Sequence, residues 1–147
     1  MAKKIGIRVM GLRLGGVAGA WAVLDVRPGN DRPVWVVNAG PLDDNIEMIE
    51  NLLQGVDFLA WERLILNDHT DAAWAFAHGR TQGRVEGIAR RMAPNARAVD
   101  ASAWRARGWL EDDGEAWREL TRDEKDAAAI AYDGWVDPIL KRGIANA

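Results

Sequence analysis

The chain has 147 residues, about the length of one domain, and 48% hydrophobic with 28% charged residues is an ordinary globular composition. No apolar stretch approaches the roughly 20 residues of a membrane-spanning helix, so we expect no membrane partner. The lack of cysteine excludes disulfides and thiolate chemistry. Because the N-terminus also lacks a signal-peptide pattern, we expect one cytoplasmic domain over 1–147.

The charged residues are unevenly distributed, although the net charge is only -3. Residues 78–109 contain seven arginines and two acids, whereas residues 110–126 contain eight acids and three bases. A basic surface beside an acidic pocket is what a metal-dependent nuclease requires. The alternative is that both segments are solvated helix faces.

The first third of the chain predicts three strands in a meander. We expect a strand over 4–10, a glycine-rich hairpin turn over 11–19 and a second strand over 20–26. A turn rich in proline and glycine over 27–33 then leads to a third strand over 34–38.

Helices and strands alternate after this meander. Asp43 or Asp44 can cap a helix that ends at Gly55, and the apolar run that follows predicts a central strand over 56–62. Apolar residues at helical spacing predict a long helix that ends before Pro94, and a short strand is expected over 96–99. The order of elements predicts an α/β domain with a mixed sheet.

The long helix carries Arg80, Arg84 and Arg91 at helical spacing, so they can line its outer side. A short helix is expected over 102–107. Five tryptophans fall at apolar positions of the expected elements and should be structural: Trp21, Trp35, Trp61, Trp74 and Trp135. Trp104 and Trp109 flank Arg105 and Arg107, and they could either pack in the core or stack on unpaired bases.

The last helix carries a paired-carboxylate pattern. Thr121 and Glu124 form a capping box, which places Asp123 and Asp126 on one face of the first turns. Two clustered carboxylates need a cation between them, and a divalent metal is the usual one. Glu62, at the end of the expected central strand, can add a third carboxylate.

These segments resemble the RuvC family of Holliday-junction resolvases, in particular its shorter phage-type members, and the resemblance covers most of the chain. The residues that carry it are Ile5-Gly-Ile7, Gly11-Leu-Arg13, Gly19-Ala-Trp-Ala-Val23, Phe58-Leu-Ala-Trp61 before Glu62, Gly79-Arg-Thr-Gln-Gly83, Ser102-Ala-Trp-Arg105 and, most specifically, Asp123-Glu-Lys-Asp126-Ala. The resemblance implies a ribonuclease H-like fold, with a mixed five-stranded sheet and helices on both faces.

The resemblance also implies two Mg²⁺ or Mn²⁺ ions, held by four carboxylates, that act on a phosphodiester. Glu62, Asp123 and Asp126 match three of those carboxylates. The family's first aspartate follows its Ile-Gly-Ile strand, where this chain has Arg8, and the register set by Gly-Leu-Arg puts Val9 there instead. Neither register supplies the fourth acid.

An arginine in place of an acid removes one negative charge and adds a fixed positive one. We therefore predict that the Arg8 guanidinium takes the place of a metal and pairs with Glu62 and with one or both of Asp123 and Asp126. Alternatively, Arg8 points to solvent and a one-metal site survives.

The sequence predicts a protein that binds four-way DNA junctions as a homodimer. Its expected phosphate contacts are Arg13, Arg80, Arg84, Arg91, Arg105 and Arg107. If the chain is an active nuclease, Glu62, Asp123 and Asp126 are both its catalytic and its metal-binding residues. One alternative is a non-catalytic pseudo-nuclease, without a metal, that binds DNA or a protein. The other is a protein-interaction module that no longer binds nucleic acid.

Overall fold

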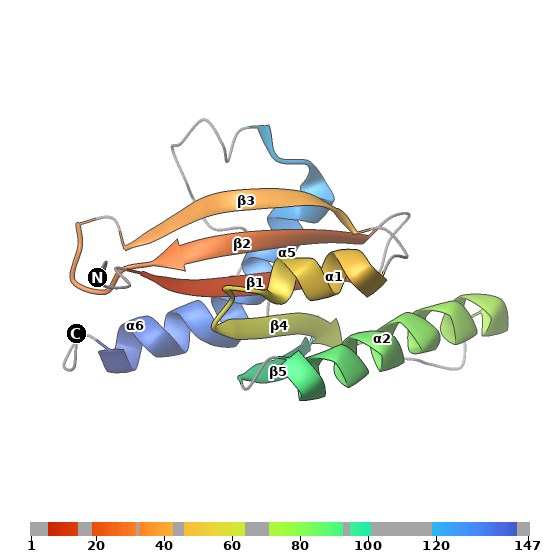
Figure 1. Ribbon diagram of the computed structural model, residues 1–147. Helices are drawn as coiled ribbons and strands as arrows, with labels where there is room; N and C mark the ends of the chain where they lie inside the picture. The colour runs from red at the N-terminus through yellow and green to blue at the C-terminus, as the bar shows by residue number, and fades with distance from the viewer. Residues whose placement is uncertain are drawn as a thin grey trace.

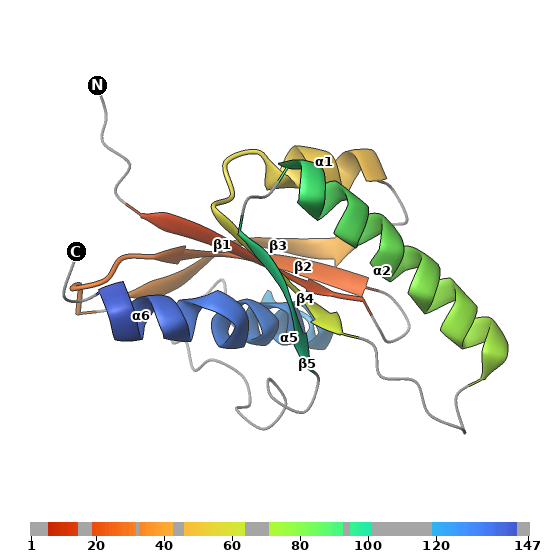
Figure 2. The same ribbon diagram turned by 90° about the horizontal axis from the view of Figure 1, so that it is seen from below.

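The computed structural model describes residues 6–14, 19–31, 33–42, 46–63, 71–92, 95–100 and 119–143. They form three layers, with a sheet between α1 and α2 on one face and α5 and α6 on the other (Figures 1 and 2). The expected helix over 102–107 and the residues Trp104, Arg105, Arg107 and Trp109 lie outside the described part.

The sheet has five strands in the order β3-β2-β1-β4-β5. Their bounds are Ile7–Arg13 for β1, Gly19–Val26 for β2, Val34–Leu42 for β3, Phe58–Arg63 for β4 and Ala96–Asp100 for β5. The first three strands pair antiparallel as a meander, and β4 is parallel to both β1 and β5. The predicted mixed α/β sheet is therefore confirmed.

The first strand begins and ends three residues later than expected. Gly11 was assigned to a turn, but it lies inside β1 and is paired with Ala22 on β2 and Ala60 on β4. A glycine is needed there because α5 crosses close to the strand. A Cβ at residue 11 would overlap the backbone oxygen of Ala127 and lie 2.8 Å from the backbone nitrogen of Ala131.

The helices follow the predicted periodicity. α1 spans Ile46–Leu53 and α2 spans Ala72–Met92, and α5 at Arg122–Ala131 continues through a π-helical turn, η1, at Tyr132–Val136 into α6 at Asp137–Gly143. The capping box is confirmed: the Glu124 amide donates to the Thr121 hydroxyl at 3.2 Å, and the Thr121 amide donates to the Glu124 carboxylate at 2.8 Å. Of the described helices, none is long and apolar enough to span a membrane.

The alanine run of α5 lets this helix approach the sheet closely. Ala127, Ala128, Ala129 and Ala131 are fully buried, and together with Ile130 they pack on one face of the sheet. Because alanine adds only a methyl group, the helix backbone comes near enough to the strands for a short side chain of α5 to reach them. This closeness positions the candidate site.

The prediction for the five tryptophans is confirmed in part. Trp21, Trp61 and Trp135 are buried and Trp35 is half-buried, but Trp74 is 39% exposed. The first half of α2 projects beyond the sheet at the end where β4 ends, so it has no sheet surface to pack against (Figures 1 and 2). The apolar periodicity of α2 corresponds to a buried face only around Val85 and Ile88.

Candidate functional site

Three charged side chains from three elements converge beside the sheet: Arg13 from β1, Glu62 from β4 and Asp126 from α5. Arg13 Nη1 donates directly to Glu62 Oε2. Arg13 Nε lies 3.4 Å from Asp126 Oδ2, an ion-pair distance without hydrogen-bond alignment. We call these three residues the ion triad.

The strand register and the pleat of the sheet bring Arg13 and Glu62 together. β1 and β4 run parallel with Leu12 beside Trp61, so the next residues, Arg13 and Glu62, are neighbours. Leu12 and Trp61 belong to the core beneath α1 and α2. Because side chains alternate between the two faces of a strand, Arg13 and Glu62 point to the other face, where α5 lies.

The ion triad is almost completely buried. The side chains of Arg13, Glu62 and Asp126 are 11%, 3% and 12% exposed. Two carboxylates in such a position repel each other and have lost most of their hydration, so they require a nearby positive charge. Arginine suits this position because its planar fork of N–H donors can bind two carboxylates at once.

Asp123, the third expected carboxylate, lies in the first turn of α5 and is half-buried. Within the described part of the chain it takes part in no ion pair with Arg13. The structure therefore brings together two of the three acids that the sequence analysis selected. Asp123 remains near this group by its place on the helix, three residues before Asp126.

The expectation that Arg8 lies among these carboxylates is wrong. Its Nε lies 3.5 Å from Asp25 Oδ1, and its backbone N–H donates to Asp57 Oδ2 at 2.8 Å. Arg8 has the same strand parity as Leu12, so it faces away from α5, and its side chain is 43% exposed. The alternative that Arg8 points away is correct, but a different arginine occupies the site.

The sequence contains a signal that could have identified Arg13. The pattern apolar-Gly-apolar-Arg occurs twice, over 5–8 and over 10–13. The resemblance was aligned on the first copy, whereas the second copy ends next to Glu62. Arg13 was predicted to contact DNA phosphates, but its guanidinium is turned toward the two buried carboxylates.

The other arginines expected to contact phosphates lie on α2, away from the ion triad. Arg80 is exposed, Arg84 is half-buried, and Arg91 is exposed with its Nη2 3.2 Å from Glu50 Oε1. The Glu50 contact partly neutralises Arg91. Arg80 and Arg84 belong to the outer part of α2 and remain the better placed pair.

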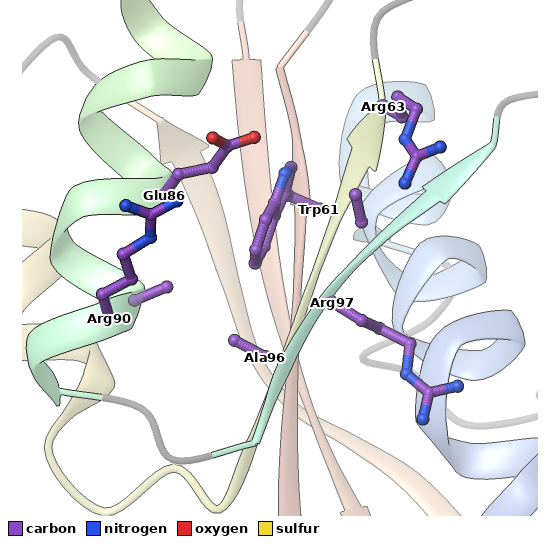
Figure 3. Close-up of a pocket in the computed structure, with 8 residues that line it drawn as sticks. Trp61, Arg63, Glu86, Arg90, Ala96 and Arg97 are labelled. Atoms are coloured by element: carbon purple, nitrogen blue, oxygen red, sulfur yellow. The ribbon is translucent and has the colours of Figure 1, made fainter.

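A pocket of about 580 Å³ lies on the opposite side of the sheet from the ion triad (Figure 3). Trp61 forms part of its wall between α2, which contributes Glu86 and Arg90, and the edge strand β5. Arg97 also lines the pocket, but its guanidinium is turned to the other face, 3.7 Å from the centre of the Trp135 ring. The pocket therefore does not contain the expected catalytic residues.

The residues of the ion triad do not fit the two-metal site that the resemblance implies. The Arg13 guanidinium occupies the space between the carboxylate oxygens that would bind a metal. Across the described ranges, no three His, Cys, Asp or Glu side chains are grouped so that they could hold a metal ion. We therefore derive no catalytic step through a metal.

No protein-family model matches the chain, and no curated protein matches its sequence. Its fold is similar to two solved structures from Thermus thermophilus. RuvC in complex with a Holliday junction substrate has a TM-score of 0.64 and 14% identity, over 94% of this chain and 97% of that one. A second RuvC structure has a TM-score of 0.59 and 15% identity, over 85% of this chain and 91% of that one.

These comparisons show an α/β ribonuclease H-like fold. Within that class, the chain has the RuvC-like arrangement that the sequence motifs predicted.

Proposed function

We propose that this chain binds branched DNA, and four-way junctions in particular. The observation that carries this proposal is the structural similarity, over nearly the whole chain, to a RuvC solved with a Holliday junction substrate. The fold alone does not determine a function. The charges of α2 provide a separate reason, because a DNA-binding surface needs arginines that reach phosphates.

Arg80 and Arg84 are the residues we assign to phosphate contacts. They are four residues apart on α2 and therefore share one side of the helix. Arginine binds phosphate oxygens through two parallel N–H bonds, and such contacts position the duplex arms of a junction without reading their sequence.

Replacing both arginines, Arg80→Glu with Arg84→Glu, should weaken junction binding at least about tenfold and lower the salt dependence by about one unit per lost contact. A gel shift with a four-way junction over a salt series measures both quantities. Arg142→Glu is the matched control, since Arg142 is exposed on α6, away from α2. If the unmodified protein shows no affinity even at low salt, the chain is a protein-interaction module instead.

The unmodified protein should bind junctions without cutting them, because Arg13 stands between the carboxylates that would hold a metal. Incubating the same complexes with Mg²⁺ or Mn²⁺ and separating the strands on a denaturing gel tests this. Strand cleavage that disappears with Glu62→Gln would show that the site is catalytic despite Arg13.

We also propose that the chain acts as a homodimer, which suits the two-fold symmetry of a four-way junction. Phe76 is 72% exposed and Trp74 is 39% exposed on the projecting half of α2, and neighbouring exposed aromatic side chains are typical of interaction surfaces. Phe76→Glu should convert the dimer to a monomer in sedimentation velocity. Val37→Glu, at another exposed apolar residue, should not; a monomeric unmodified protein would contradict the proposal.

A further inference from the structure

We propose that Arg13 is a permanent cation of this site, which replaces a divalent metal and holds Glu62 and Asp126 together without one. This inference goes beyond junction binding. It concerns the DNA-free protein and does not rest on the proposed function, so each can fail without the other.

The first step is that β1 can reach the site only through residue 13. The β1 residues that face α5 are Val9, Gly11 and Arg13. Val9 is fully buried in the apolar core beneath α5, and no side chain fits at Gly11 because the α5 backbone lies against it. The single position from which β1 can place a charged group beside Glu62 and Asp126 therefore carries a cation.

The second step concerns charge. Two carboxylates that are almost fully buried need compensation, and a metal supplies it only while it is bound. An arginine keeps its positive charge at every pH at which proteins fold, and here it is attached to the neighbouring strand. The ion triad is thus compensated in the free protein under all ordinary conditions, with one unit of negative charge left over.

The third step concerns competition for the same oxygens. Mg²⁺ needs about six oxygen ligands at about 2.1 Å in a near-octahedral arrangement. The Arg13 guanidinium contacts Glu62 Oε2 directly and lies beside Asp126 Oδ2. A metal ion at this place would have to displace those contacts and would be repelled by the fixed positive charge. Metal binding therefore requires that Arg13 leave the site or be replaced.

The unmodified protein provides the first test. We expect the same melting temperature in EDTA and in Mg²⁺ or Mn²⁺, and no localised Mn²⁺ broadening of the NMR signals of residues in α5. A rise in melting temperature on adding metal that is lost in Asp126→Asn, or broadening centred on Asp126, would overturn the proposal. This test needs no variant at Arg13.

The variant Arg13→Asp provides the second test. It places a third carboxylate beside Glu62 and Asp126, so it should melt several degrees lower in EDTA and recover on adding Mg²⁺ or Mn²⁺, because a ligand that binds only the folded state stabilises it. Arg8→Asp is the matched control: the same substitution on the other face of β1 should give no metal response.

If Arg13→Asp does not fold without metal, Arg13→Gln provides a neutral substitute that leaves Glu62 and Asp126 uncompensated. It should show the same recovery with Mn²⁺ to a smaller extent. If neither variant gains a metal response, the Arg13 guanidinium is not what keeps metal out and the proposal is wrong.

Discussion

Arg13→Met should lower the free energy of unfolding by about 3–5 kcal/mol, because it leaves two buried carboxylates without a positive charge. Methionine retains much of the length of the arginine stem, so the loss of packing is small. The side chains of Glu62 and Asp126 are only 3% and 12% exposed, and water cannot replace the lost contacts efficiently. Urea denaturation followed by tryptophan fluorescence measures this change.

Two further variants separate charge from packing. Adding Glu62→Gln and Asp126→Asn to Arg13→Met removes the uncompensated charges and should recover most of the lost stability, because a buried ion group can often be replaced by neutral side chains of similar size. Arg8→Met should cost at most about 1 kcal/mol, since the Arg8 side chain is 43% exposed and lies 3.5 Å from Asp25. If the triple variant is no more stable than Arg13→Met, the loss comes from packing.

The fold could be predicted from the sequence because its signals are local. Hydrophobic periodicity indicated α2 and the central strand, and Thr121 with Glu124 indicated the start of α5 to the residue. The first strand was misplaced because glycines normally indicate turns. Gly11 instead serves a contact with α5, more than 110 residues later in the chain, and such a contact is not visible in the local sequence.

The acids of the site could be predicted, but their cation could not. Glu62 and Asp126 follow from a strand end and a helix face. The choice between Arg8 and Arg13 depends on strand parity, and parity changes when a strand boundary moves by one residue. Trp74 was assigned to the core for a related reason: periodicity shows that a helix has an apolar side, but it does not show where the sheet beneath it ends.

Gly11→Ala should lower the free energy of unfolding by about 3 kcal/mol or more, because the new methyl group would overlap the backbone of α5. The contacts are the Ala127 oxygen and, at 2.8 Å, the Ala131 nitrogen, and neither can move without shifting the helix. Gly83→Ala is the matched control. It lies inside α2 with no atom within 4 Å of the added Cβ, so it should increase stability by about 0.5–1 kcal/mol. Urea denaturation of both variants measures the difference.

The Gly11 contact also determines how far Asp126 lies from Arg13, since Asp126 precedes Ala127 on α5. If Gly11→Ala pushes α5 away from the sheet, the ion pair between Asp126 and Arg13 is already weakened in that variant. Asp126→Asn should then cost less stability in the Gly11→Ala protein than in the unmodified one, and a double-mutant cycle measures this coupling. Equal costs in both backgrounds would mean that the ion triad forms independently of the close approach between β1 and α5.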